Sequence, residues 1–245
     1  MPLLAPVTTA RLPLRWRSIG CRPIAGVNTF ESHREVDGPV YPRRVRVWRR
    51  KAIEGKGAAV TDSPARERIL RTATALFIST GIRVVGVDRL IAESGVARAT
   101  FFRHFPTKDD LVVAFLESQA ADARRELTRI RSERPGGARA LLAEIATGAK
   151  MGMECTGFRG CEFINTAAEY SDPDHITRVV VDRHRAWVRD IMVDALEELG
   201  HPTPFATAEV LFTMRTGAIV ASSLEGFHDP DGAFDRAWWA LVDQS

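Results

Sequence analysis

Residues 86–111 constrain the fold of this chain more than any other stretch. They read GVDRLIAESGVARATFFRHFPTKDDL, in which a glycine separates two short segments with apolar residues at helical spacing. The segments span about 87–94 and 98–105, so each allows only about two helical turns. Two short helices joined through Gly95 and stopped at Pro106 have the spacing of a helix-turn-helix. The sequence therefore predicts this DNA-binding motif.

The apolar positions divide the second segment into an inner and an outer face. Val96, Phe101 and Phe105 are expected to face the core. The remaining residues form the predicted DNA-contacting set: Arg98, Ala99, Thr100, Phe102, Arg103 and His104. Short side chains let a helix approach the floor of a groove, and arginines can reach guanine edges or phosphates. Lys108, at the start of the next helix, is expected to bind a phosphate.

Helical patterns follow one another from residue 61 onward, with almost no strand signal. Besides the two short segments, helices are expected at about 64–80, 108–134, 138–151, 161–170, 172–199, 204–224 and 232–242. Thr107 and Asp110 stand in the positions of a capping box at the start of the second of these. We predict an all-α protein, in which a three-helix helix-turn-helix domain precedes a helical bundle.

The first sixty residues differ from the rest of the chain in charge. They hold 12 Lys+Arg and 4 Asp+Glu, whereas the other 185 residues carry a net charge of −5. The pI near 9.0 therefore reflects this segment and does not indicate that the body of the protein binds nucleic acid. Six of the 13 prolines also lie here, and no periodic apolar pattern persists.

Three interpretations of residues 1–60 compete. The composition favours a disordered basic extension, which is absent from the working protein if translation starts later. A basic arm that binds nucleic acid is the second interpretation. A secretory signal is disfavoured because Arg11, Arg15 and Arg17 interrupt the apolar run that it requires.

Several function classes lack support in the sequence. No run of about 18 uncharged apolar residues occurs, so no membrane span is predicted. Three cysteines are too few for a secreted disulfide scaffold, which makes the cytoplasm the expected compartment. No metal-ligand spacing, nucleophile elbow or Gly-rich phosphate loop is found. We expect no enzymatic activity, no cofactor and no metal.

The predicted motif resembles the DNA-binding domain of the TetR family of bacterial transcriptional repressors. The family pattern has an inner apolar residue, then Ala-Gly-Val-Ser, Leu-Tyr-x-His-Phe and a lysine just past the recognition helix. The matching residues here are Leu90, Ser94-Gly95-Val96-Ala97, Phe101-Phe102-Arg103-His104-Phe105 and Lys108. The resemblance is dense over about residues 63–118 and sparse beyond them.

Three residues depart from the family pattern. Ala97 stands where the family usually has serine, which removes a helix cap typically worth about 1 kcal/mol. Gly86 replaces a threonine at the start of the preceding helix, a milder change for a cap. Phe102 replaces a tyrosine whose hydroxyl commonly reaches a phosphate in the family, so one contact with the DNA backbone is expected to be missing.

The resemblance implies a domain organisation and a function. Residues 61–110 would bind DNA, and residues 111–245 would bind a ligand and dimerise. The implied function is that of a repressor that binds a palindromic double-stranded DNA operator as a homodimer and is released by a small, largely apolar effector. The alternative is an architectural or non-specific DNA-binding protein without an effector. An enzyme would need an acid–base pair or a metal site, which the sequence lacks.

Polar residues among apolar ones inside a helical bundle are typical of binding sites. The candidates are Phe115, Phe163, Asn165, Thr166, Tyr170, His184, Trp187, Phe212 and Arg215. Each of them has the alternative of being an ordinary core or surface residue. Cys155 and Cys161 suggest a redox switch if both are exposed, and two incidental thiols otherwise.

The last two helices, at about 204–224 and 232–242, are expected to form the dimer interface. Small residues allow close helix approach and apolar ones supply buried area. The small set is Gly217, Ala218, Ala221 and Ser222, and the apolar set is Leu211, Met214, Leu224, Phe234, Trp238 and Leu241. The alternative is that these residues belong to the core of a single chain.

Overall fold

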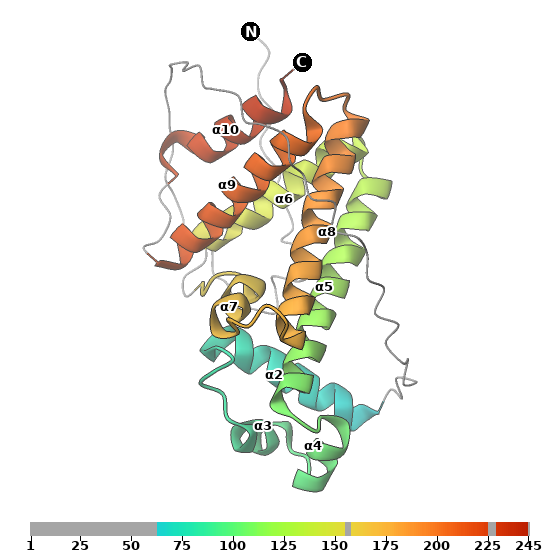
Figure 1. The fold of residues 1–245 in the computed structure, drawn as a ribbon, viewed down its shortest axis with the longest axis vertical. Coiled ribbons are helices and arrows are strands. Elements are labelled where there is room, and N and C mark those ends of the chain that lie inside the picture. Colours follow the sequence, from blue (N-terminus) through green and yellow to red (C-terminus); the bar gives the residue numbers. More distant parts are fainter. Residues whose placement is uncertain (1–62, 155–157, 225–228, 245) are drawn as a thin grey trace, which may run out of the picture.

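The structure is a computed structural model that describes residues 63–154, 158–224 and 229–244 (Figure 1). The predicted basic extension, residues 1–60, and Cys155 lie outside these ranges. The elements are α2 (Pro64–Thr80), α3 (Val87–Ser94), α4 (Arg98–His104), α5 (Lys108–Glu133), α6 (Gly137–Glu154), α7 (Glu162–Glu169), α8 (Ile176–Glu198), α9 (Pro204–Leu224), η1 (Pro230–Gly232) and α10 (Ala233–Val242).

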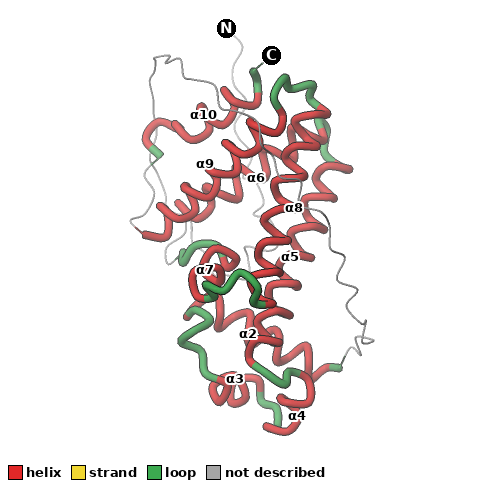
Figure 2. Tube along the Cα trace, in the orientation of Figure 1, coloured by secondary structure: helices red, strands yellow, loops and turns green. Residues whose placement is uncertain are grey.

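The arrangement of the helices confirms the predicted all-α fold, and no strand occurs in the described ranges (Figure 2). The short helices α3 and α4 lie at one end of the molecule beside α2 (Figure 1). From there α5 runs toward the other end, packed against α6 and α8. Helix α9 packs on α6 and α8, and α10 covers α9 at the end opposite the helix-turn-helix.

Local signals set the start of α5 as the sequence predicts. The Thr107 hydroxyl oxygen accepts a hydrogen bond from the Asp110 amide at 3.1 Å, and the Thr107 amide donates to the Asp110 carboxylate at 2.9 Å. This reciprocal pair is a complete capping box, which satisfies two amides that the first turn would leave unpaired.

Helix α8 begins later than the sequence suggests. The Asp172-Pro173 pair is typical of a helix start, but the helix begins at Ile176. The Asp172 carboxylate instead accepts from the Asp174 amide at 3.0 Å, which closes a local turn ahead of the helix. His175 caps the helix, and its Nδ1 accepts from the Thr177 amide at 3.3 Å.

Two apolar cores hold the helices together. The first is built around α2, α3, α4 and α5 and extends to Phe163 on α7 and to Val180 and Val181 on α8. The second joins α6, α8, α9 and α10 around the fully buried Trp238. The first core therefore continues past residue 110, and the division of the chain there remains a prediction. None of the helices in the described ranges is both long and apolar enough to cross a membrane.

Part of the predicted dimer interface lies inside the chain. Five of its residues are buried within the described fold: Leu211, Ala218, Ser222, Phe234 and Trp238. For these five residues the structure supports the alternative that they belong to the core of a single chain, and four of them, all but Ser222, are part of the second core. Other apolar residues of α9 remain open to solvent: Phe205, Val210 and Leu224 are 64%, 46% and 76% exposed.

Candidate nucleic-acid interface

The turn between α3 and α4 depends on the backbone of Gly95. This residue has φ 63° and ψ 31°, and its amide donates to the carbonyls of Ile91 and Ala92 at 3.2 and 3.3 Å. A side chain in this left-handed conformation costs about 1–2 kcal/mol, which glycine avoids. The two predicted short helices are thus joined through the predicted glycine, and the helix-turn-helix is present.

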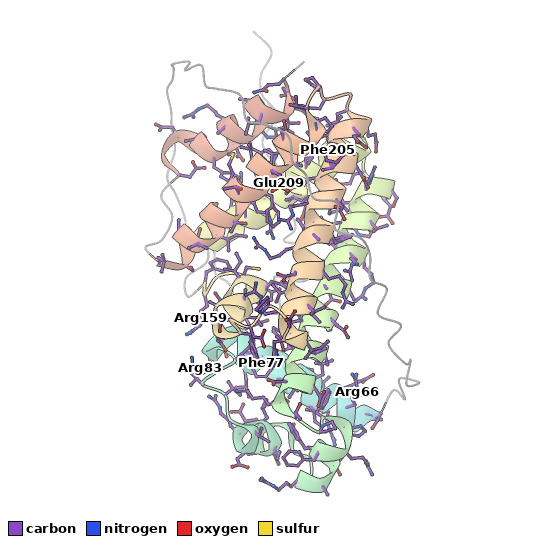
Figure 3. All side chains as sticks on the ribbon, viewed as in Figure 1. Arg66, Phe77, Arg83, Arg159, Phe205 and Glu209 are labelled. Atoms are coloured by element: carbon purple, nitrogen blue, oxygen red, sulfur yellow. The ribbon has the colours of Figure 1, made fainter. Side chains whose placement is uncertain are left out.

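The inner face of α4 anchors it to the first core. Phe101 is fully buried and Phe105 almost so, with ring centroids 6.4 Å apart. The Arg66 guanidinium from α2 lies 5.2 Å from the centroid of the Phe105 ring (Figure 3). Val96 is buried as well. These contacts orient the opposite face of α4 toward solvent.

The outer face carries most of the predicted DNA-contacting residues. Arg98, Ala99, Phe102 and Arg103 are exposed, whereas Thr100 and His104 are half-buried. His104 Nε2 lies 3.4 Å from the hydroxyl oxygen of Ser63, just before α2. His104 therefore contacts the start of α2, which the sequence did not indicate.

Arg98 is held by a neighbour from α3. Its guanidinium donates to the Asp88 carboxylate at 2.6 Å and lies 5.4 Å from the centroid of the Phe102 ring. The two charged side chains are 67% and 85% exposed, so the pair is worth about 1 kcal/mol at most. Arg98 can therefore exchange Asp88 for a base or a phosphate at little cost. Arg103 has no ion pair with any described residue.

Lys108 lies where α5 begins, but its ammonium group already forms a hydrogen bond within the protein. Nζ donates to the carbonyl oxygen of Ile82 at 2.6 Å, which ties α5 to the loop between α2 and α3. Burial lowers the pKa of Lys108, while the charges of Glu169 and Asp109 oppose this shift. A phosphate contact from Lys108 requires the ammonium to leave Ile82, and it remains a prediction.

A second set of contacts joins the start of α5 to the residues between α7 and α8. The Tyr170 hydroxyl donates to the Asp109 carboxylate at 2.7 Å, and His175 Nε2 lies 3.4 Å from the other carboxylate oxygen. Burial and the Asp109 carboxylate raise the pKa of Tyr170, so the phenol stays protonated and keeps donating. We call Asp109, Tyr170 and His175 the junction triad.

Beside the junction triad lies an open hollow of about 230 Å³. It is lined by Ile82, Arg83, Lys108, Glu169 and Tyr170. A second open hollow, of about 320 Å³, lies on α9 and is lined by Glu209, Val210, Thr213 and Met214. Of the predicted effector-binding residues, only Tyr170 lines either hollow.

Five of the predicted effector-binding residues lie on α7, α8 and α9 in one region. The rings of Phe163 and His184 stack at 3.7 Å, and His184 lies 5.7 Å from Trp187. Phe212 is buried under two arginines of α8, and the half-buried Arg215 follows it by one turn of α9.

The other four predicted residues have partners elsewhere. Phe115 is fully buried and packs edge-on against Phe77 at 5.4 Å, where α2 meets α5 (Figure 3). The buried Thr166 hydroxyl donates to the carbonyl of Glu162 within its own helix at 2.7 Å. Asn165 is exposed and donates to the Arg159 carbonyl at 2.7 Å. Tyr170 belongs to the junction triad.

Cys161 is a free, half-buried cysteine at the start of α7. Burial raises the pKa of its thiol, and the charge of Glu162 raises it further. A raised pKa disfavours the thiolate that a redox switch requires. Within the described ranges, no three His, Cys, Asp or Glu side chains are grouped so as to hold a metal ion.

Sequence reasoning missed several residues that these contacts single out. They are Asp88, Asp109, His175, Arg185 and Arg189. Arg185 and Arg189 are four residues apart on α8, so helical spacing could have placed them on one face. Nothing local indicates the partners of Asp109, because Tyr170 is 61 residues away.

The start of α4 allows a direct stability prediction. Ala97 is its N-cap residue, and no side chain caps the helix. Ala97→Ser should increase the free energy of unfolding by about 1 kcal/mol, because the hydroxyl can accept from an unpaired amide of the first turn. Ala99→Ser, in the same helix, is the control and should be neutral or slightly destabilising. Urea unfolding measures both, and equal effects would contradict the capping argument.

Comparisons with known proteins agree with this geometry. Residues 69–115 match the family model described as bacterial regulatory proteins, tetR family. The crystal structure of a TetR-family transcriptional regulator from Streptomyces coelicolor is 37% identical, with a TM-score of 0.64, and the match covers 73% of this chain and 94% of that one.

Two further matches involve the repressor NemR of Escherichia coli. The HTH-type transcriptional repressor NemR of strain K12 is 24% identical over an alignment of 179 residues, and the match covers 69% of this chain and 89% of the relative. The crystal structure of the reduced form of E. coli NemR has a TM-score of 0.59 at 22% identity, covering 72% of this chain and 95% of that one. The similarity in fold thus extends well beyond the helix-turn-helix.

Proposed function

Because this chain belongs to the TetR family of transcriptional regulators, we propose that it represses transcription as a homodimer bound to a palindromic operator and leaves the operator when a small effector binds. The observation that carries the proposal is the outer face of α4, exposed above a buried anchor of Phe101 and Phe105. The relative NemR is named as a repressor, which supports repression rather than activation as the proposed effect on transcription.

In this proposal α4 enters the major groove, and the two copies of a dimer contact half-sites about 34–36 Å apart. Arg98 and Arg103 supply base or phosphate contacts from the exposed face. Lys108 contributes a phosphate contact after its ammonium leaves the Ile82 carbonyl.

The arginines and the lysine are expected to differ in their effects on DNA affinity. Arg98→Ala or Arg103→Ala should each cost about 1–3 kcal/mol of operator binding and relax specificity at one position. Lys108→Ala should weaken binding to all sequences and reduce the slope of log K against log salt by about 1. Fluorescence anisotropy over a salt series, with the operator and a scrambled duplex, measures both effects.

Asp88→Asn is the matched control for Arg98. It removes the carboxylate that holds Arg98 and a negative charge near the DNA, so operator affinity should stay the same or rise. Operator affinity that is unchanged in all three cation variants would overturn the assignment of α4 as the recognition helix.

The exposed apolar face of α9 is the proposed dimer interface. This helix carries only two charged residues, Glu209 and Arg215, among its 21. A helix that is apolar on most sides is normally covered on most sides. Val210 and Met214 line the open hollow, and Gly217 is exposed where a close approach of a second copy needs a small residue. Pairing with a symmetry mate covers this face in an isologous contact.

The effector is proposed to act near Phe163, His184 and Trp187. Phe163 stacks on His184 of α8 and also belongs to the core that contains Phe77 and Phe115. A shift of α8 relative to α7 therefore displaces residues that contact α2 and α5. The contacts are made by this core and by the junction triad. In the dimer, the separation of the two α4 helices decides whether both reach their half-sites. An effector that favours a non-binding separation by a few kcal/mol is sufficient to release the operator.

One observation favours the alternative of a DNA-binding protein without an effector. Both hollows described above are open to solvent rather than enclosed. Screening for compounds that raise the melting temperature distinguishes the two, because a ligand that binds the folded state stabilises it. Release of operator by the same compound supports the repressor; stabilisation without release supports the alternative.

The first sixty residues are proposed to be dispensable for specific binding. A chain that begins near Val60 should melt within about 2 °C of the full chain, since the segment has no periodic apolar pattern. Removing its charge of +8 should lower non-specific DNA affinity at low salt. Calorimetry and footprinting measure these properties. Loss of the footprint would instead support the basic-arm interpretation.

A further inference from the structure

Two arginines of α8 lie over one aromatic ring of α9, and a third arginine lies close to one of them. The guanidinium carbons of Arg185 and Arg189, one turn apart on α8, lie 4.6 and 4.9 Å from the centroid of the Phe212 ring. Arg215 follows Phe212 by three residues on α9 and is close enough to Arg185 for its charge to act there. We call Arg185, Arg189 and Arg215 the arginine cluster.

The arginine cluster is only partly balanced by carboxylates. Arg189 lies 3.7 Å from Glu209, whose position on α9 is labelled in Figure 3. Arg185 and Arg215 have no ion pair with any described residue. Asp182 is close enough for its charge to act on Arg185, but its own ion pair, at 3.7 Å, is with Arg178. Among the described residues, Arg189 is thus the one member of the arginine cluster with an ion pair.

All three side chains are half-buried, which makes this excess of positive charge costly. Burial lowers the pKa of Arg185, and the charges of Arg189 and Arg215 lower it further, whereas the Cys161 thiol and the Asp182 carboxylate oppose this shift. Cation–π contacts with Phe212 offset a part of the cost. An arrangement that places like charges together at a cost to stability is typical of a binding site that lacks its ligand.

We propose that the arginine cluster binds the oxyanion head of an aromatic organic acid, which is the effector of the regulator. A guanidinium offers two parallel N–H donors that match a carboxylate or a phosphate, and an anion between Arg185 and Arg215 relieves their repulsion. The apolar body contacts Phe212, which is 4% exposed beneath Arg185 and Arg189 and is uncovered when these side chains turn toward the anion. This inference rests on the proposed function and changes the expected effector from largely apolar to anionic at one end.

Titration calorimetry on the full chain without DNA tests the site. The probes are 2-naphthoate, 2-naphthyl phosphate and the neutral 2-naphthamide, which share one aromatic body. At least one of the two anions should bind with an affinity about tenfold or more above that of the amide. The anion that binds more tightly identifies the head group as a carboxylate or a phosphate. Arg185→Gln and Arg215→Gln should each lower the affinity for the anion about tenfold and leave the affinity for the amide unchanged.

Arg183→Gln is the matched control, because Arg183 lies on α8 but is exposed and bonded to Glu117 at 3.0 Å. It should not change anion binding. The Arg215→Gln variant should also melt at the same or a higher temperature than the wild type, since it removes repulsion and breaks no ion pair with a described residue. A variant that melts several degrees lower would indicate a structural role and overturn the proposal.

Equal affinity for the anions and the amide, no binding of any probe, or full anion affinity in both glutamine variants would also overturn the anion site. Operator binding is measured separately, without probe, and both variants should retain it. Failure of the wild type to bind an operator would overturn the proposed function and leave the anion site standing. The two failures are therefore distinguishable.

Discussion

Val210→Asp is expected to make the protein monomeric and to remove detectable operator binding. Val210 is an exposed apolar residue in the hollow on α9, so the folded chain should tolerate the charge. In the proposed dimer the aspartates of two symmetry mates would be buried without partners, which costs several kcal/mol. A monomer contacts one half-site and loses the avidity of the pair, a factor of about 10²–10⁴. Sedimentation velocity and footprinting measure the two effects.

The control for this variant places the same charge elsewhere. Ala168→Asp lies on an exposed position of α7 and should leave both assembly and operator binding unchanged. Ala218 is unsuitable for such a test because it is only 4% exposed, so an aspartate there would disrupt the core. A Val210→Asp protein that remains a dimer with full operator affinity would place the interface on another face.

Phe101→Ala should be the most damaging single change in the helix-turn-helix. The side chain is fully buried and forms the main anchor of a helix of only seven residues. Removing a buried phenylalanine costs about 3–5 kcal/mol in lost burial and cavity formation. We expect α4 to exchange its amide hydrogens much faster and the operator footprint to disappear. Hydrogen exchange and urea unfolding measure these changes.

Two further variants serve as comparisons for the destabilisation by Phe101→Ala. Phe102→Ala alters a side chain that is 37% exposed. It should therefore lower the free energy of unfolding of the protein much less than Phe101→Ala does. Phe101→Leu retains most of the volume and should fall between the two. Equal destabilisation by Phe101→Ala and Phe102→Ala would mean that the inner and outer faces of α4 have been assigned wrongly.

The elements around the helix-turn-helix were predictable because their signals are local. Gly95 in the left-handed conformation, the capping box of Thr107 and Asp110, and the stop at Pro106 each act within a few residues. Such signals specify where a helix begins and ends without any knowledge of tertiary contacts. The bounds of α3 and α4 accordingly agree with the sequence analysis to within one residue.

Contacts between distant segments could not be predicted in the same way. Lys108 binds the Ile82 carbonyl and Asp109 binds Tyr170 only because α5 passes beside both segments. The apolar residues of α9 posed a related problem. Ala218 and Val210 both suit an interface by residue type, but only the packed helices reveal that the first is already covered.

The length of α5 has a mechanical consequence. Its 26 residues form one continuous helix of about 39 Å, which starts at the junction triad and ends beside α6 and α8. A stiff rod of that length converts rotation into translation: tilting it by about 5° about its far end displaces its first turn by about 3 Å. Helix–helix shifts of about 1–2 Å are common in switching proteins. In the proposed mechanism, such a rod would amplify a small rearrangement near the effector region into a displacement large enough to take α4 out of register with its half-site.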